Sequence, residues 1–460
     1  MRKSAFGAAL AVLMSAALMS TGLTSATVFG GFSAFAASPH ANTPVTVSVS
    51  ATNGTQVGTG FAGFSYEKDQ VGADVFSSTD TNLVNLFRLL GPNIIRIGGN
   101  QVDRVNWNPN GAGGSATQIA PSDVTKLAGF LQATGWKVIY GIDLKINTAA
   151  NAASEAQFAA QALGSSLVAF EIGNEPDFYD TQAQYESSFS SYVSAIKAKV
   201  PGATFDGPGQ GKGQSWVNTF GAHEKTKSLS ILTSHIYVDS AANATISAML
   251  ASNNPGGKLQ TAEATMNTGR ANNGLPQWRM SETNSFFNGG TTGVSDVEAA
   301  SLWSLDYLSG VAAHNGAGLN FHGGSTSKYT PIVFSGTQPT SVQGVYYGQL
   351  LWVLGGTGAY HSASVSGGSS VTAWGIGKNV FVNNKSTSAI TATITLNATA
   401  TTAREYVLTA PSLTSKSVTV AGSAVSVGGA FNPAPQSVSV SGTRVVINVP
   451  ADSAALVVAQ

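Results

Sequence analysis

Eight apolar runs of β-type sequence restrict the fold of this chain more than any other feature. Near-continuous apolar strands are typical of parallel sheets that are buried on both faces, and the segments between them have helical periodicity. Eight such units predict a (β/α)₈ TIM barrel over residues 59–356, with an open, doubly wound parallel sheet as the alternative. The runs are 59–67, 93–99, 137–144, 167–175, 203–209, 229–238, 276–284 and 316–324.

The pattern changes after the last of these runs. Residues 357–460 are rich in Val, Thr, Ser and Ala, alternate with a period of two, and contain turn residues at short intervals. This predicts a C-terminal antiparallel β-sandwich domain. A strand-like stretch at 43–52 has the same pattern, so we expect the N-terminal segment 37–58 to pair with that domain.

The first 36 residues have the pattern of a secretory signal peptide. Arg2 and Lys3 precede an apolar stretch at 5–19, and Ala34-Phe35-Ala36 offers a small-x-small cleavage site. A transmembrane anchor fits less well, because small residues and Ser or Thr interrupt the stretch. We therefore expect a protein that is secreted or released into the periplasm, with no membrane attachment once the signal is removed.

The composition excludes several classes of partner. The 23 Lys and Arg balance the 23 Asp and Glu, and no basic cluster occurs, which argues against nucleic acid. The chain has no cysteine, and its six histidines lack the spacing of metal ligands. We expect no metal, no cofactor, a core without disulfides, and a monomer.

Two glutamates end different strands of the predicted barrel. Glu175 ends the fourth run, directly after Asn174, and Glu282 ends the seventh. A barrel places its active site at the carboxyl ends of its strands, so both carboxylates should face one mouth. Glycosidic bond cleavage needs two such carboxyl groups, one protonated to assist the leaving oxygen and one ionised to attack carbon or activate water.

Neighbouring strands carry side chains that suit this chemistry. Arg96, inside the second strand, would hold a carboxylate ionised and oriented. His235 and Tyr237 alternate onto one face at the end of the sixth strand, where Tyr237 can donate to Glu282. Glu171 lies deeper on the fourth strand and is expected to pair with an inward arginine. A single glutamate at a strand end is usually solvated. The prediction of a catalytic pair therefore depends on finding both glutamates together with Arg96, His235 and Tyr237 at one end of the barrel.

The segments "EIGNEP", "RIGG", "SHIY" and "SETN" together resemble glycoside hydrolase family 79, the β-glucuronidase and heparanase-like family of retaining (β/α)₈ hydrolases. The resemblance implies a C-terminal β-domain joined by an N-terminal strand. It also implies Glu175 as the acid/base and Glu282 as the nucleophile. For retention of configuration, their carboxyl groups should lie ~5–5.5 Å apart.

The same resemblance implies where the sugar binds. Asn174 would contact a hydroxyl beside the cleaved bond, Glu67 and Asp103 look like further hydroxyl ligands, and Tyr329 matches a tyrosine that contacts a uronic carboxylate. His322, at the end of the eighth strand, is expected to line the pocket. Beside these, Trp107 is placed to stack on a sugar ring.

One position departs from the family pattern. Phe286 and Phe287 stand where the resemblance predicts a tyrosine hydroxyl, and the loss of one donor would cost ~1–3 kcal/mol of discrimination for a carboxylate. We expect a secreted retaining β-glycosidase acting on a carbohydrate, with β-glucuronidase activity first. The alternatives are a neutral or 4-O-methylated sugar, or a catalytically inactive carbohydrate-binding protein.

Overall fold

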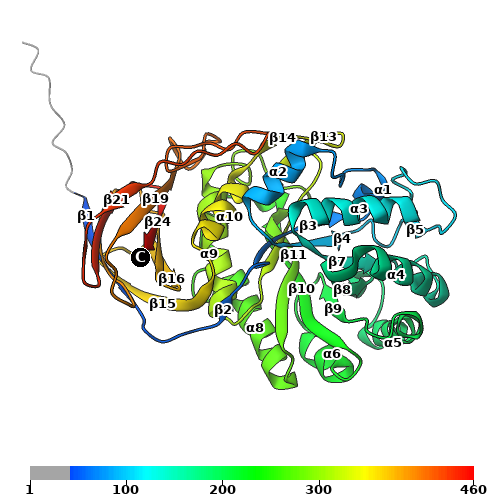
Figure 1. Cartoon of the computed structure of the whole chain (residues 1–460). Helices are drawn as coiled ribbons and strands as arrows, with labels where there is room; N and C mark the ends of the chain where they lie inside the picture. The colour runs from blue at the N-terminus through cyan, green and yellow to red at the C-terminus, as the bar shows by residue number, and fades with distance from the viewer. Residues whose placement is uncertain (1–41) are drawn as a thin grey trace, which may run out of the picture. The chain divides into compact units, whose positions relative to one another are not determined.

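The computed structural model describes residues 42–460, so the predicted signal peptide lies outside the described part of the chain. Eight parallel strands close into a barrel in the order β10-β11-β12-β3-β4-β7-β8-β9 (Figure 1). Closure excludes the doubly wound sheet and confirms the TIM barrel. The strands are β3 (Ala62–Glu67), β4 (Ile94–Gly98), β7 (Lys137–Ile142), β8 (Leu167–Ile172), β9 (Phe205–Gln210), β10 (Leu229–Ser240), β11 (Gln277–Phe287) and β12 (Leu319–His322).

Helices follow the strands and cover the outside of the barrel (Figure 1). Within residues 42–460, none of them has the length and apolar character required to cross a bilayer. They are α1 (Asp69–Gly72), α2 (Thr81–Leu89), α3 (Pro121–Thr134), α4 (Ala149–Leu163), α5 (Gln182–Lys199), α6 (Val217–Glu224), α7 (Ile246–Ala251), α8 (Lys258–Asn273), α9 (Glu298–Ala313) and α10 (Gly344–Leu354).

Local sequence sets several helix ends. The Asp80 side chain accepts the backbone N–H of Leu83 at 3.0 Å and so caps α2. Thr181 and Gln184 form a capping box at the start of α5. Gly135 ends α3 in the left-handed conformation, with φ 75°, which glycine adopts without steric cost.

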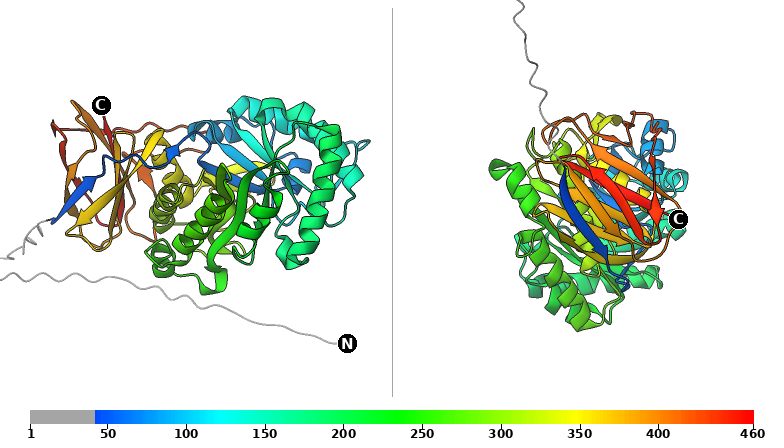
Figure 2. Two further views of the ribbon diagram at one scale, coloured as in Figure 1. Left: turned by 90° about the horizontal axis from the view of Figure 1, so that it is seen from below. Right: turned by 90° about the vertical axis from the view of Figure 1, so that its left-hand side faces the viewer.

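Two small sheets pair β5 (Asn106–Trp107) with β6 (Gln118–Ile119) and β13 (Ile332–Ser335) with β14 (Gln338–Val342). The remaining strands form a larger second sheet, which curves so that its faces enclose a core of their own. All its pairs are antiparallel except that of β1 (Thr43–Val49) with β18 (Ile390–Thr395), and β1 also pairs with β15 (Gly358–Ser366) (Figure 2). The N-terminal strand therefore lies inside the C-terminal sheet. The other strands are β2 (Gln56–Val57), β16 (Val371–Ile376), β17 (Asn379–Asn384), β19 (Ala403–Thr409), β20 (Thr419–Val420), β21 (Gln436–Val438), β22 (Val440–Ser441), β23 (Arg444–Val449) and β24 (Ser453–Ala459).

The barrel and this sheet share a buried contact along α9 and α10. Trp352 on α10 stacks on Phe61 below β3 and on Phe381 of β17, with centroids 5.3 and 5.7 Å apart. Asp306 on α9 is ion-paired with Lys385 and accepts the Asn383 amide at 2.9 Å. Because one hydrophobic cluster runs through both parts, we expect them to unfold together.

Candidate active site

A cavity of about 590 Å³ opens at the carboxyl ends of the barrel strands. Its size is within the range of roughly 300–1,000 Å³ of small-molecule sites. The structure brings nearly all of the predicted site residues into its wall: Glu67, Asp103, Asn174, Glu175, Tyr237, Glu282, Phe287, His322 and Tyr329. Arg96 and His235 lie behind this wall and bond to the two central glutamates.

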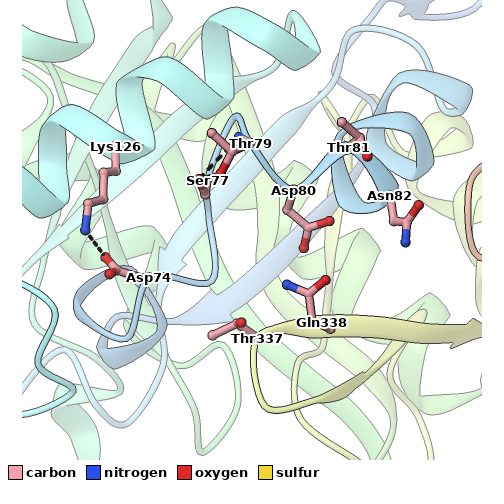
Figure 3. Close-up of a pocket in the computed structure, with 9 residues that line it drawn as sticks. All are labelled: Asp74, Ser77, Thr79, Asp80, Thr81, Asn82, Lys126, Thr337 and Gln338. Atoms are coloured by element: carbon pink, nitrogen blue, oxygen red, sulfur yellow. Dashed lines mark hydrogen bonds and ion pairs between the residues drawn. The ribbon is translucent and has the colours of Figure 1, made fainter.

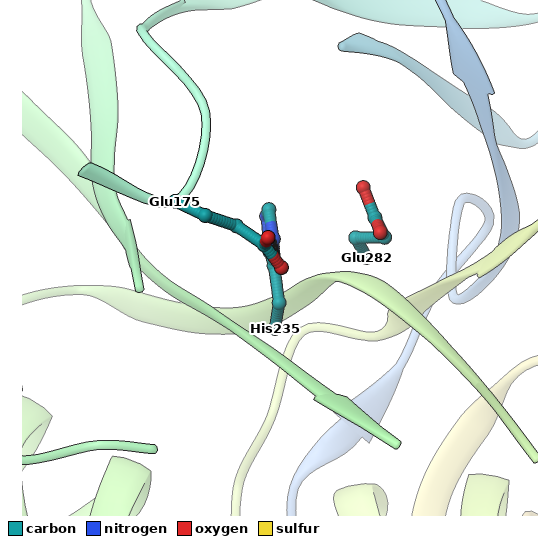
Figure 4. A group of neighbouring side chains, drawn as sticks. All are labelled: Glu175, His235 and Glu282. Atoms are coloured by element: carbon teal, nitrogen blue, oxygen red, sulfur yellow. Dashed lines mark hydrogen bonds and ion pairs between the residues drawn. The ribbon is translucent and has the colours of Figure 1, made fainter. Parts of the chain in front are cut away.

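The two glutamates face each other across the cavity, with His235 beside them (Figure 4). One carboxylate oxygen of Glu175, one of Glu282 and a ring nitrogen of His235 all lie within 4.8 Å of one another. His235 Nδ1 is 3.2 Å from Glu175 Oε1. Oxygens on two carboxylates at this separation can reach the two sides of a single glycosidic bond.

Glu282 is a buried carboxylate that its surroundings hold ionised. Tyr237 donates its hydroxyl to Oε1 at 2.8 Å, and Arg96 Nη1 donates to Oε2 at 2.6 Å. Burial alone would raise the pKa of Glu282, but the charges of His322, His235 and Arg96 and the bond from Tyr237 lower it well below its usual value. A carboxylate held in this state is suited to act as a nucleophile.

Arg96 links this carboxylate to the fourth strand. Its side chain is fully buried, forms an ion pair with Glu171, and donates from Nη2 to Asn174 Oδ1 at 2.8 Å. Because the Asn174 oxygen accepts this bond, its amide nitrogen is left to face the cavity. The expected pairing of Glu171 with an inward arginine is present, and Arg96 is its partner.

The glycines of "RIGG" make room for this network. A Cβ on Gly98 would lie 2.2 Å from Arg96 Cζ, and a Cβ on Gly99, whose φ is +69°, would lie 2.3 Å from a Glu67 carboxylate oxygen. A side chain at either position would displace a charged group. These two glycines therefore allow Arg96 and Glu67 to take their places.

A second buried carboxyl pair lies behind Arg96. Strand pairing places Asp206 on β9 opposite Glu171 on β8, and neither oxygen of Asp206 meets a donor among residues 42–460. Burial and then the charge of Glu171 raise the pKa of Asp206 well above its usual value. A proton on Asp206 would make it a donor toward Glu171 and would leave Glu171 and Glu282 as the two carboxylates that share Arg96.

Two backbone features aim the glutamates. Glu175 has φ 47° and ψ 55°, a left-handed conformation that costs a non-glycine residue roughly 1–2 kcal/mol and that turns the chain sharply after β8. In β11 the register shifts, so that Ser234 pairs with Met280 but His235 pairs with Glu282. The extra residue lets Arg279 and Glu282, three positions apart, both point into the barrel.

Glu67 and His322 form the opposite wall of the cavity. Glu67 Oε2 accepts the backbone N–H of Gln101 at 2.7 Å, and its Oε1 lies 3.7 Å from His322 Nε2. Burial opposes protonation of His322, but Glu282 and Glu67 together raise its pKa above the usual value. Between these two carboxylates, a protonated His322 would place positive charge beside Glu282.

Asp103 has a task that the sequence did not reveal. It lines the cavity, but its oxygens accept the backbone N–H groups of Leu144 and Asn174 at 2.9 and 3.1 Å and the Tyr179 hydroxyl at 3.0 Å. These bonds fix the loop that presents Asn174. Asp103 therefore braces the site, whereas we had expected it to bind a sugar hydroxyl.

The prediction that Trp107 stacks on a sugar ring was wrong. Its side chain is 4% exposed, packs against Phe158 and donates to Ser154, away from the cavity.

Of the two phenylalanines, Phe286 is buried and only Phe287 reaches the cavity. Sequence reasoning missed several lining residues, because they lie on loops without a recognisable pattern: Asn100, Arg104, Lys145, Phe178, Tyr179, Gly211 and Asn288.

The cluster of Glu175, His235 and Glu282 also has the ligand types of a metal site. Both oxygens of Glu282, however, already accept hydrogen bonds, from Tyr237 and from Arg96. The Arg96 guanidinium supplies the positive charge that a cation would bring. The bonds from Tyr237 and Arg96 therefore suit a reactive carboxylate at Glu282 better than a metal ligand.

A second cavity, of about 370 Å³, lies outside the barrel mouth, beside the start of α2 (Figure 3). Its wall contains the exposed ion pair of Asp74 and Lys126, at 2.6 Å, and the capping residue Asp80. Asp74 is neutralised by Lys126 and Asp80 serves the helix end. This arrangement does not provide the facing carboxylates found in the larger cavity.

The fold is that of (β/α)₈-barrel glycoside hydrolases. The structure is similar to a 4-O-α-L-rhamnosyl-β-D-glucuronidase from Fusarium oxysporum 12S, with a TM-score of 0.74, 22% identity, and coverage of 90% of this chain and 99% of that one. It is also similar to a family 51 α-L-arabinofuranosidase from Bifidobacterium longum, with a TM-score of 0.69, 15% identity, and coverage of 90% and 99%.

In sequence, the chain is 25% identical over 303 residues to a β-glucuronidase from Aspergillus niger. That match covers 56% of each protein, so the chain spans about half the length of this relative. No family model matches the chain. The resemblance to the β-glucuronidase and heparanase-like family that the motifs indicated is confirmed by these similarities.

Proposed function

We propose that this protein is a retaining β-glycosidase, with β-glucuronides as its first substrates. The observation that carries the proposal is the pair Glu175 and Glu282, whose oxygens lie within 4.8 Å of each other in the cavity. Retaining glycosidases hold their carboxyl groups about 5–5.5 Å apart, whereas inverting enzymes leave roughly 6.5–9.5 Å for a water. The similarity to a β-glucuronidase supports the choice of sugar.

In the first step, an oxygen of Glu282 attacks the anomeric carbon. The bond from that carbon to the leaving oxygen breaks, and the proton of Glu175 passes to the leaving oxygen. In the second step, Glu175 takes a proton from water, the water oxygen attacks the same carbon, and Glu282 leaves. The amide of Asn174, oriented by Arg96, is placed to bind the hydroxyl next to the reacting carbon.

Two basic side chains in the wall could bind an acidic sugar. Arg104 and Lys145 line the cavity beside its carboxyl groups, and either can pair with the carboxylate of a uronic acid. Tyr329 adds a hydroxyl, while Phe287 offers only an apolar ring where the family resemblance implies a donor. That substitution makes a 4-O-methylated glucuronide or a neutral sugar the second candidate.

Stereochemistry and substitution test the mechanism. Proton NMR of the first product should show the β-anomer, and Glu175→Gln and Glu282→Gln should each lower turnover by several decades. An α-anomer, or an unchanged rate in either variant, would refute the assignment. A panel of aryl β-glucuronide, 4-O-methylglucuronide, glucoside, galactoside and xyloside then tests the sugar, and turnover of neutral sugars alone would overturn glucuronidase activity.

We further propose that the protein is exported by its first 36 residues and acts as a monomer outside the cytoplasm. The signal pattern of the first 36 residues supports export. Expression of the full chain, followed by mass spectrometry of the extracellular or periplasmic protein, should find an N-terminus near Ala37. Retention of the intact chain in the cell would contradict export.

A further inference from the structure

Phe178 is an exposed aromatic side chain at the mouth of the cavity. Among residues 42–460, the large hydrophobic side chains that are exposed are Ile146, Phe178, Phe287 and Val446. Phe178 is the most exposed of them, at 58%, and it lines the cavity together with Phe287. An apolar ring exposed in the wall of a cavity is available to contact a ligand that enters it.

The ring lies beside the carboxyl group of Glu175. A Cβ built on Gly211 would be 2.5 Å from Glu175 Cδ and 2.7 Å from Phe178 Cε2. The two atoms are therefore no more than about 5 Å apart. Gly211 leaves room for both side chains, so the ring edge and the proposed acid share one side of the cavity.

The turn that carries the ring is fixed. The Asp177 carboxylate accepts the backbone N–H groups of Gly211 and Lys212 at 2.9 and 2.7 Å. Lys212 donates to the Asp177 carbonyl at 2.9 Å, and its ammonium lies 4.6 Å from the centroid of the Phe178 ring. One face of the ring is covered by this cation–π contact. Little entropy would be lost when a ligand stacks on the ring.

The reaction proposed above distinguishes the two sides of the cavity. Glu175 donates its proton to the leaving oxygen, so the leaving group must lie on the side of Glu175. Phe287 lies on the other side, edge-on to the ring of Tyr237 at 6.3 Å, next to the nucleophile. The two exposed rings therefore contact different halves of the substrate.

We propose that Phe178 is the platform for the leaving group and that the preferred leaving group is a planar aromatic alcohol. This inference rests on the proposed function, because it takes Glu175 as the acid. The polar groups next to the ring are already paired: Asp177 accepts from two backbone amides, and Lys212 binds a carbonyl and the ring. A second sugar would find few free partners for its hydroxyls here, whereas an aromatic ring needs only the apolar face.

Two substrates with the same sugar but different leaving groups test the platform. One is 4-methylumbelliferyl β-glucuronide, and the other is β-glucuronyl fluoride, whose leaving group has no ring. The loss of one stacked ring pair predicts that Phe178→Ala lowers kcat/KM for the aryl substrate about 2- to 12-fold. The fluoride rate should stay within about twofold, and Phe178→Leu should fall between wild type and Phe178→Ala. Phe287→Ala, as the matched control on the sugar side, should change both substrates by the same factor.

The outcomes separate this inference from the function itself. A ratio of aryl to fluoride rates that Phe178→Ala leaves unchanged would overturn the platform while leaving the glycosidase intact. Faster cleavage of a disaccharide than of the aryl substrate, lost in Phe178→Ala, would replace the aromatic alcohol by a second sugar. If the wild type turns over neither these two substrates nor any other aryl β-glycoside of the panel, the proposed function falls and the platform falls with it.

Discussion

Tyr237→Phe removes one hydrogen bond to the proposed nucleophile and changes nothing else in the shape of the side chain. The Tyr237 hydroxyl donates to Glu282 Oε1 at 2.8 Å, and burial followed by the charge of Glu282 raises the pKa of Tyr237 well above its usual value. The tyrosine therefore remains a donor throughout the working pH range. The other oxygen of Glu282 keeps its bond to Arg96.

A hydrogen bond to a charged group contributes roughly 1.5–3 kcal/mol. At about 1.4 kcal/mol per tenfold change, its removal predicts a loss of about 10- to 150-fold in kcat/KM. The variant should unfold about 1–2 kcal/mol more easily, because one buried oxygen loses a partner. Since one of the groups that stabilise the ionised carboxylate is gone, the acid limb of the kcat/KM profile should also move to higher pH.

The assay is steady-state hydrolysis of an aryl β-glucuronide between pH 4 and 9, with urea unfolding of the same samples. Tyr346→Phe is the matched control, because Tyr346 is buried and donates to the Leu86 carbonyl at 2.7 Å, outside the cavity. It should lose stability without losing kcat/KM. If Tyr237→Phe keeps the wild-type kcat/KM, the idea that Glu282 is a nucleophile held by Tyr237 is refuted.

Three further changes test the electrostatics and the packing. Because the pKa of Glu282 lies below its ordinary value of 4.5, the ionised carboxylate stabilises the fold above pH 4.5 and this stabilisation is lost as pH falls below it. The free energy of unfolding should therefore decrease less between pH 5 and pH 3 in Glu282→Gln than in the wild type. Because the pKa of Asp206 is raised, the stability that its protonated form contributes is lost as pH rises. Asp206→Asn keeps a donor toward Glu171 at every pH, so the variant should gain stability relative to wild type between pH 5 and pH 9. A difference in urea unfolding that stays constant over this range would contradict a proton shared between Asp206 and Glu171. Trp374→Ala, which removes a ring stacked on Phe381 at 5.2 Å, should cost about 3–5 kcal/mol in one cooperative thermal transition, and two separate transitions would contradict a common core.

The fold could be predicted because its signals repeat. Most residues of each barrel strand are buried, and a barrel strand overlaps every one of the eight predicted runs. Helix ends such as Asp80 and Gly135 follow from local rules of capping. The parallel pairing of β1 with β18 had no such signal, because alternation fixes which face of a strand is buried but leaves its partner and direction open.

The site was predictable where a side chain lies on a barrel strand. Glu67 and His322 are the last residues of β3 and β12, Glu282 lies midway along the longer β11, and the closed barrel brings all three to one cavity. Asp103 lies in a turn after β4 and Trp107 in the two-residue strand that follows, and neither segment is long enough for periodicity to indicate which way a side chain points. Both residues were expected at the site because they follow the second predicted strand, but only Asp103 lines the cavity.

Glu282 also shows why alternation alone would have misplaced the nucleophile. Arg279 faces the barrel interior, where it donates to the Gly60 carbonyl at 2.6 Å, and a strand with strict period two would send residue 282 to the opposite face. The register shift in β11 reverses this, so that Glu282 meets Arg96 and Tyr237. Deletion of Ser281 removes the extra residue and leaves Glu282 two positions after Arg279, where strict alternation points both side chains into the barrel. A folded deletion variant should therefore keep Glu282 facing Glu175 and keep measurable turnover. Loss of all turnover in a deletion variant that still folds would contradict the idea that the shift serves only to set the face of Glu282.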